Sequence, residues 1–304
     1  MSSKHLDEIL DRHNQITNAL VVVADIEKYS QRRTLAQVAV VEAFTSNVAG
    51  ALEDVSKEYV TYAQKNSVNF ETDILRLPTG DGVVVAFPFD GIPDIHLQFA
   101  RALVGRVGES NAENDCARFA QDGWCNCHAN HNIRVGIDEG KSVIYRDVNS
   151  DYNIAGNAIN LSARVMAEAD PNQILLSGRA YSQLIDLVSD PALSDKFRAY
   201  QDIGVKHGLR IGIHQYMNED DQFLNTSLAS DPALQEEMSA ASEMLKGGMP
   251  LIPSGADPIE QGRAVVEAMK MLGSIGSTLQ GSNNSAAPGP GELPEQPTDD
   301  RVES

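Results

Sequence analysis

Residues 18–30 read NALVVVADIEKYS, in which six apolar residues lead directly into an aspartate. The apolar run from Ala19 to Ala24 predicts a buried strand, with Asp25 at the point where that strand ends. Ser30 follows as the predicted N-cap of a long helix, because apolar residues recur every three or four positions to about Tyr59. The stretch therefore predicts a carboxylate held between a buried strand and a long helix.

Two β-rich runs, residues 70–77 and 83–87, follow the helix, and the sequence PTGDG between them has the turn residues of a hairpin. Asp81 lies in that turn, and chain-adjacent strands can bring it close to Asp25. Paired carboxylates beside a backbone carbonyl suit Mg²⁺ or Mn²⁺, which take oxygen ligands and bridge nucleotide phosphates. Taken alone, an aspartate in a glycine-flanked turn is more often only a turn residue.

Strand and helix patterns alternate as far as residue 216. An amphipathic helix carries apolar residues at 95, 99, 103 and 107, and a second β-rich pair, 133–137 and 142–145, has Gly140 at its predicted turn. The later predicted elements are a helix at 156–169, a strand at 174–176, a helix at 182–188, and strands at 197–205 and 210–216. This order predicts an α+β fold, a ferredoxin-like βαββαβ sandwich with helices on one face of an antiparallel sheet.

Composition changes along the chain and indicates its domain organisation. We expect an N-terminal helix at 1–17, a catalytic domain at 18–217 with an insertion loop at 108–132, a helical extension at 218–273, and a disordered acidic tail at 274–304. The tail is rich in Gly, Ser, Asn and Pro and too poor in apolar residues to offset its ordering entropy.

The overall charge and the cysteine content narrow the class of protein. The 304 residues include 24 Lys and Arg against 43 Asp and Glu, which argues against nucleic acid as the main partner. No continuous apolar run approaches the ~20 residues of a membrane span, so we expect no membrane insertion. Three cysteines without a signal peptide favour a reducing, cytoplasmic location.

A second group of polar residues carries donors and positive charge. Asn160 and Arg164 in GNAINLSAR are four residues apart, so they share one face of the predicted helix. An arginine presents a planar fork of donors that matches phosphate oxygens, and Arg134 and Lys206 are further cations in or beside predicted strands. Each of these residues alone is more simply explained by surface solvation.

Taken in order, the blocks ADIEKYS, LPTGDGVVVAF, RVGIDEG, YNIAGNAINLSAR and GVKHG resemble the catalytic domain of the class III nucleotidyl cyclases, over about residues 18–217. The resemblance implies a head-to-tail homodimer with active sites at the interface, and a nucleoside triphosphate as substrate. It also implies two divalent metal ions per site, Mn²⁺ or Mg²⁺, held by Asp25, Asp81 and the carbonyl of Ile26.

The resemblance also implies roles for the other candidate residues. Arg134 would contact the triphosphate from the same chain, with Tyr29 near the phosphates. The partner chain would supply Asn160 to orient the ribose, Arg164 to stabilise charge on the α-phosphate, and Lys206 to hold the terminal phosphates. The implied reaction is in-line attack of the ribose 3′-oxygen on the α-phosphate, with diphosphate leaving.

The departures from the family pattern concern the nucleobase. Where adenylate cyclases of this family carry a Lys and an Asp that read adenine, this sequence has Leu77 and Asn153. Leu77 offers no hydrogen bond to a purine, whereas the amide of Asn153 has a donor and an acceptor that can pair with uracil or cytosine. A pyrimidine substrate is therefore expected.

These departures resemble the pyrimidine cyclases of the bacterial antiphage system known as Pycsar, which implies conversion of UTP to cyclic UMP. A separate effector would then respond to the product and not to contact with the cyclase. Three alternatives stay open: a cytidylate cyclase making cyclic CMP, an adenylate cyclase with divergent base recognition, and an inactive nucleotide-binding regulatory module.

The predicted insertion loop contains a separate group of residues that resemble zinc ligands in type: Cys116, Cys125, Cys127, His128 and His131. Cys125 and Cys127 are only two positions apart, which differs from the usual spacing in structural zinc sites. Reduced loop thiols are therefore the preferred interpretation, and zinc is the alternative.

Overall fold

A computed structural model describes residues 3–12, 16–114, 126–205 and 209–228. The chain divides into two units, residues 1–235 and 236–304, and all described residues belong to the first. Its strands are β1 (Ile16–Ile26), β2 (Leu75–Pro78), β3 (Gly82–Phe87), β4 (Ile133–Arg146), β5 (Tyr152–Gly156), β6 (Ile174–Ser177), β7 (Phe197–Val205) and β8 (Leu209–Tyr216). Its α-helices are α1 (Lys4–Leu10), α2 (Thr34–Glu58), α3 (Val60–Asn66), α4 (Ile95–Glu113), α5 (Asn157–Ala167) and α6 (Gly178–Leu187).

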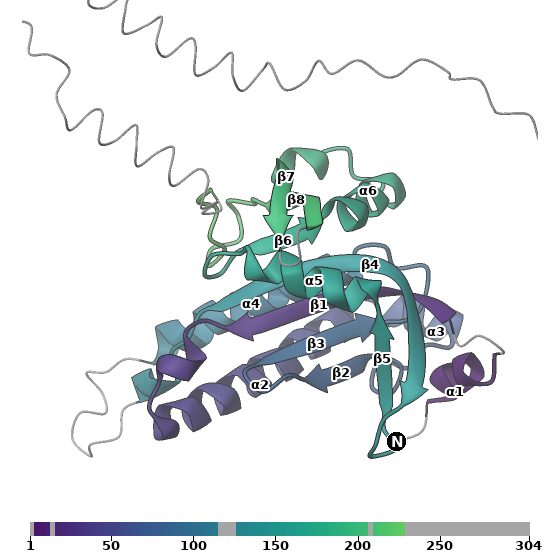
Figure 1. The fold of residues 1–304 in the computed structure, drawn as a ribbon, viewed down its shortest axis with the longest axis horizontal. Helices are drawn as coiled ribbons and strands as arrows, with labels where there is room; N and C mark the ends of the chain where they lie inside the picture. The colour runs from purple at the N-terminus through teal and green to yellow at the C-terminus, as the bar shows by residue number, and fades with distance from the viewer. Residues whose placement is uncertain (1–2, 13–15, 115–125, 206–208, 229–304) are drawn as a thin grey trace, which may run out of the picture. The chain divides into compact units, whose positions relative to one another are not determined.

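The strands form one sheet in the order β2-β3-β1-β4-β6-β8-β7, with β5 paired to β4 (Figure 1). The α+β fold class predicted from the sequence is confirmed. Two details differ from the prediction: β4 and β6 pair in parallel, so the sheet is mixed, and helices cover both of its faces. The crossover helix α5 between β4 and β6 makes this parallel pair, since parallel strands require a long connection.

Two hydrophobic clusters account for the two covered faces. The larger one lies between the sheet and α2, α4 and α6, with Phe44, Phe87, Phe99 and Leu103 among its buried members. The smaller one, which we call the α1 cluster, lies on the opposite face and includes Leu6, Ile9, Ala19, Val21, Val23, Leu75, Val84, Ala86, Ile144, Ile154 and Ala158. Apolar residues alternate between these two clusters along β1, so the strand is buried on both faces.

Helix α2 is long and apolar enough, by length and composition only, to cross a membrane. A search for continuous apolar runs does not detect it, because polar residues such as Glu42 and Asn47 interrupt the pattern. In the fold, Val40, Phe44 and Val48 are buried in the larger cluster, which makes α2 a core helix of the sandwich.

The β-rich segment around Gly140 differs from the prediction. β4 is one continuous strand of 14 residues, and Gly140 lies inside it, not in a turn. The turn occurs at residues 147–151, before β5, where the side chain of Asp147 accepts hydrogen bonds from the amides of Asn149 and Asp151. The small size of Gly140 leaves room for Arg179, since a Cβ there would lie 2.9 Å from its guanidinium.

Three predicted boundaries also move. A 3₁₀ turn, η1 (Tyr29–Gln31), contains Ser30, and α2 begins after Arg33 as its N-cap. α4 continues to Glu113, so the predicted insertion loop 108–132 begins with helix and ends with the 3₁₀ turn η3 (Asn126–Ala129). The predicted N-terminal helix 1–17 is limited to α1, because β1 already begins at Ile16.

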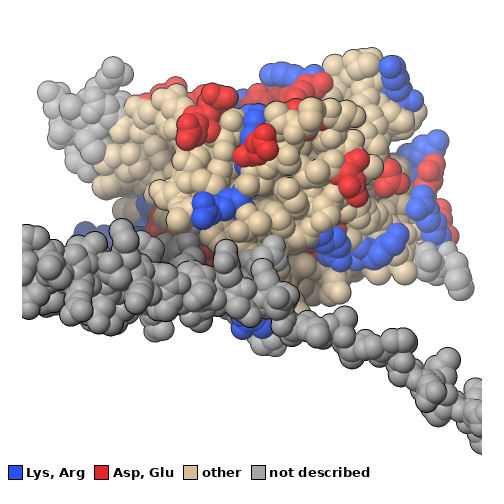
Figure 2. Space-filling view, turned by 90° about the horizontal axis from the view of Figure 1, so that it is seen from above, with Lys and Arg blue, Asp and Glu red and all other residues tan. Residues whose placement is uncertain are grey.

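The predicted helical extension 218–273 begins with an irregular segment, residues 218–228, that packs on α4 and β8. Asp221 accepts two hydrogen bonds from Arg101 on α4, and the carbonyl of Ser227 accepts from Gln173 and Gln215. The rest of that extension and the predicted tail lie outside the described residues. On the face drawn in Figure 2, acidic and basic side chains are interspersed and not gathered into one basic patch.

Candidate active site

Asp25 occupies the end of the central strand β1, between β3 and β4. In the strand register it is opposite Gly82 on β3 and Arg134 on β4. The amide of Ile26 donates to the carbonyl of Asp81 at 3.0 Å, which draws the β2–β3 turn against the end of β1. Gly82 permits this approach, since a Cβ there would lie 2.5 Å from the carbonyl oxygen of Ala24. The structure therefore brings together the two carboxylates that the sequence singled out.

The electrostatics around Asp25 favour an additional cation. Its side chain is 18% exposed, and the Nη2 atom of Arg134 lies 2.6 Å from its Oδ2 atom. Burial raises the pKa of the Asp25 carboxyl, the hydrogen bond from Arg134 opposes that rise, and the nearby charge of Asp81 adds to it. A buried carboxylate beside a second negative charge, such as Asp25, would be stabilised in its ionised form by a bound divalent cation.

The donor set fits a hard divalent metal ion. Asp25 and Asp81 supply carboxylate oxygens, and Ile26 is the last residue of β1, where a backbone carbonyl can join them. Oxygen donors of this kind suit Mg²⁺ and Mn²⁺. Among the residues that the structure describes, no group of three or more His, Cys, Asp or Glu side chains could hold a metal ion. The fit therefore rests on two carboxylates and a carbonyl.

Tyr29 lies in η1, four residues beyond Asp25, and its ring is half-buried against the larger hydrophobic cluster. Lys28, just before it, has a left-handed backbone with φ of 53° and forms an ion pair with Glu27. Glu27 also accepts a hydrogen bond from Asn132 at 3.3 Å. Sequence reasoning missed this link between the two loops, since only the register of β1 and β4 brings Glu27 and Asn132 together.

Asn160 and Arg164 lie one turn apart on α5, as predicted from their spacing. Asn160 is exposed, and Arg164 is half-buried. α5 is held close to β4 because Gly136 leaves room for the backbone of Ser162 and Met166. Within the described part of the chain, neither Asn160 nor Arg164 forms a hydrogen bond with the Asp25 and Asp81 carboxylates. Lys206, the third predicted contributor of this group, falls outside the described residues.

The two candidate base-recognition residues lie on strands that contact each other, β2 and β5. Leu77 is half-buried and packs on the α1 cluster. Asn153 is half-buried, and its Oδ1 atom accepts from the amide of Ile154 at 2.8 Å. Tyr152 and Ile154 both contact the α1 cluster, so strand alternation directs Asn153 to the other side of β5. Within one chain, the two side chains therefore do not share a face.

The Cys and His group of the predicted insertion loop is only partly described. Cys116 and Cys125 fall outside the described residues, and Cys127 is half-buried in η3. His131 is only 3% exposed; its Nδ1 atom lies 2.8 Å from the carbonyl of Ala129, and its ring packs edge-on against Phe44. His131 is therefore packed as a core residue.

Comparison with known proteins was made by sequence and by structure. Neither a protein-family model nor a curated protein sequence matches the chain. A bacterial light-regulated adenylyl cyclase structure matches with a TM-score of 0.50 and 13% identity, over 71% of this chain and 56% of that one.

Two further solved structures give lower scores. The guanylate cyclase domain of RhGC from Catenaria anguillulae, solved with GTP, matches at TM-score 0.44 and 14% identity, over 66% of this chain and 96% of that one. The adenylyl cyclase CyaB from P. aeruginosa matches with a TM-score of 0.42 and 21% identity, over 67% of this chain and 95% of that one. From the match to the light-regulated cyclase we conclude that the first unit of this chain has the fold of a nucleotidyl cyclase catalytic domain.

Proposed function

We propose that this protein is a nucleotidyl cyclase that converts a pyrimidine nucleoside triphosphate, UTP in preference to CTP, to the 3′,5′-cyclic monophosphate and diphosphate. The observation that carries the proposal is the meeting of Asp25, Asp81 and Arg134 at the ends of three neighbouring strands. Two carboxylates next to a guanidinium suit the binding of a metal-bound triphosphate, which supports the proposal.

In the proposed mechanism, Asp25, Asp81 and the carbonyl of Ile26 would hold two divalent ions. When bound, such ions neutralise phosphate charge and activate the attacking and leaving oxygens. Before substrate binds, Arg134 is paired with the Asp25 carboxylate. When the triphosphate binds, Arg134 exchanges this contact for the phosphates. Tyr29 and Lys206 complete the phosphate contacts.

The remaining steps belong to α5. Asn160 orients the ribose so that its 3′-oxygen faces the α-phosphorus, and Arg164 stabilises the negative charge that grows on the α-phosphate during in-line attack. Asn160 is exposed on α5, where a second copy of the chain can reach it. We therefore propose a head-to-tail homodimer in which one chain supplies the carboxylates and its partner supplies Asn160, Arg164 and Lys206.

The base preference rests on residue chemistry at two positions. Leu77 presents only a hydrocarbon surface, so it offers nothing that pairs with a purine edge. The Asn153 amide can serve a pyrimidine as donor and acceptor, which requires it to exchange its local bond with the Ile154 amide for the base. By resemblance to the Pycsar cyclases, we propose a cytoplasmic second-messenger generator in bacterial antiphage defence, whose effector responds to the cyclic nucleotide.

The proposal is tested by incubating the purified full chain with Mn²⁺ and each of ATP, GTP, CTP and UTP in separate reactions, with products identified by mass spectrometry. Cyclic UMP as the main product is the expected result. Cyclic CMP would keep the mechanism and change the base, and cyclic AMP would overturn the interpretation of Leu77 and Asn153. If no triphosphate reacts, the regulatory-module alternative replaces the enzyme.

A further inference from the structure

The short helix α1 is anchored on the sheet by two fully buried side chains. Leu6 and Ile9 are both 0% exposed. They belong to the α1 cluster, to which β1, β2, β3, β4 and β5 all contribute. A helix of seven residues has little stability of its own, so its position depends on the burial of these two side chains.

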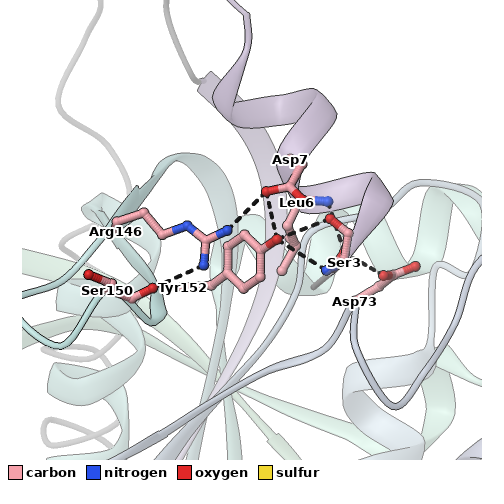
Figure 3. Close-up of polar contacts among 7 residues, drawn as sticks. All are labelled: Ser3, Leu6, Asp7, Asp73, Arg146, Ser150 and Tyr152. Carbon is pink, nitrogen blue, oxygen red and sulfur yellow. Dashed lines mark hydrogen bonds and ion pairs between the residues drawn. The ribbon is translucent and has the colours of Figure 1, made fainter. Parts of the chain in front are cut away.

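A set of polar contacts ties the same helix to two strands (Figure 3). The N-cap Ser3 accepts from the amide of Leu6, and its hydroxyl donates to Asp73 at 2.6 Å. The Tyr152 hydroxyl lies 2.7 Å from an oxygen of Asp7 and 3.1 Å from the amide nitrogen of Ser3. Arg146 donates to the same Asp7 oxygen at 2.9 Å, and its guanidinium lies over the Tyr152 ring.

These contacts differ in strength because they differ in burial. Ser3 is 0% exposed and Asp73 is 2% exposed, so the hydrogen bond between them is sheltered from water. The Arg146 and Asp7 side chains are 41% and 42% exposed, and such an ion pair contributes little. The Tyr152 hydroxyl is part-buried and contacts both Ser3 and Asp7, which makes it the main polar link between α1 and β5.

Both strands held by α1 carry a candidate base-recognition residue. Asp73 lies two residues before β2, the strand of Leu77. Tyr152 opens β5 and is the residue immediately before Asn153. β2 and β5 contact each other but are not paired in the sheet, so no ladder of backbone hydrogen bonds fixes their separation. Besides this direct contact, α1 and its N-cap link the two strands through Asp73 and Tyr152.

We propose that α1 fixes the position of β5 relative to β2 and thereby places Asn153 for nucleobase selection, with Tyr152 as the positioning residue. The inference rests on the proposed function for the role of Leu77 and Asn153. A shift of β5 relative to β2 moves Asn153 away from the base while leaving the carboxylates on β1 and the β2–β3 turn in place. Loss of the link therefore affects base binding more than the chemical step.

The test compares Tyr152→Phe with Tyr145→Phe in the full chain. Both substitutions remove one hydroxyl from the same β4–β5 hairpin, and Tyr145 is directly opposite Asn153 in register but lies outside the polar set around α1. For Tyr152→Phe we expect KM for the preferred triphosphate to rise about three- to tenfold, as for loss of one or more part-buried hydrogen bonds, with kcat within about twofold. The ratio of kcat/KM for the preferred triphosphate to kcat/KM for the others is expected to fall in Tyr152→Phe. Tyr145→Phe is expected to keep the wild-type KM, kcat and selectivity.

Amide hydrogen exchange supplies a readout that does not depend on activity. Tyr152→Phe is expected to increase exchange in α1, β2 and β5 and to leave β7 and β8 unchanged. Equal kinetics and selectivity for the two variants would overturn the inference, and so would unchanged exchange in β2. If the wild type makes no cyclic nucleotide, the proposed function fails, and the exchange comparison alone decides whether α1 couples the two strands.

Discussion

Asp81 contributes a carboxylate to the candidate metal site but little to the hydrophobic core, because it is half-exposed in a turn between two glycines. We expect Asp81→Ala to lower turnover by about 100-fold or more, a loss typical of removing an essential electrostatic contact. The thermal unfolding temperature is expected to stay near that of the wild type. Initial rates with Mn²⁺ and the preferred triphosphate, together with a thermal melt, check both parts.

A matched control for this variant is Asp186→Ala, which removes an exposed carboxylate from α6, away from the candidate site. It should retain wild-type turnover, since long-range charge effects are screened by salt. If Asp81→Ala is as active as this control, Asp81 does not hold a catalytic metal ion.

His96 provides a pH prediction for stability. It is fully buried on α4, both of its ring nitrogens lack a hydrogen-bond partner among the described residues, and burial lowers its pKa to about 4. The folded protein keeps the imidazole neutral, whereas the unfolded chain takes up a proton below pH 6.5. Stability linked to His96 is therefore present above pH 6.5 and is lost as the pH falls from 6.5 towards 4.

His96→Leu removes this titration. The free energy of unfolding of the variant, relative to that of the wild type, is therefore expected to increase as the pH falls from 7.5 to 5. Denaturant unfolding at the two pH values measures that difference. A difference that is the same at both pH values would show that protonation of His96 does not contribute.

The residues of the candidate site could be selected from sequence, but the contacts between them could not be predicted. Asp25 and Asp81 are recognisable because each belongs to a short local pattern. Asp25 directly follows an apolar run, and Asp81 lies between two glycines in a turn. The ion pair between Arg134 and Asp25 depends on the pairing of β1 with β4, where the two residues are 109 positions apart in the chain. Local patterns carry no information about that register.

At the scale of elements, the packing of α5 on β4 depends on Gly136. A Cβ at this position would collide with the carbonyl of Ser162 and the backbone of Met166. Gly136→Ala is therefore expected to destabilise the protein by about 1–3 kcal/mol, as overpacking does, and to lower turnover because α5 carries Asn160 and Arg164. Denaturant unfolding and initial rates measure the two effects.

Gly105→Ala is the control for that substitution. Gly105 lies within α4, and a Cβ there would have no atom within 4 Å, so the variant should be neutral or more stable by up to about 1 kcal/mol. If Gly136→Ala also proves neutral, close contact between α5 and β4 is not needed for stability.

The hairpin of β4 and β5 shows where element prediction fails. The sequence pattern predicts a turn at Gly140. In the structure this glycine lies within β4, and its small size accommodates Arg179, which binds the buried Asp138. The actual turn, DVNSD at 147–151, also had a signal, since Asp, Asn and Ser favour turns and Ser150 adopts a φ of 66°. Sequence alone does not distinguish a glycine needed for packing from one needed for a turn.

At the scale of the whole molecule, most of the order of strands and helices was predictable from apolar spacing, but α3 and β5 were not predicted, and the predicted strand pair 133–137 and 142–145 is the single strand β4. The parallel pairing of β4 with β6 and the cover of α1 and α5 on the second face were not predictable, since they depend on contacts between distant segments.

The most direct test of the account mixes two inactive variants, Asp81→Ala and Asn160→Ala, and measures cyclic nucleotide formation with Mn²⁺ beside the wild type. We expect each site to combine the carboxylates of one chain with α5 of its partner. Random pairing of the two variants then makes half of the dimers heterodimers, and each heterodimer has one intact site of its two. The mixture therefore recovers up to about a quarter of wild-type activity. An active wild type with an inactive mixture would contradict a site shared between two chains, and a wild type that forms no cyclic nucleotide would contradict the proposed function itself.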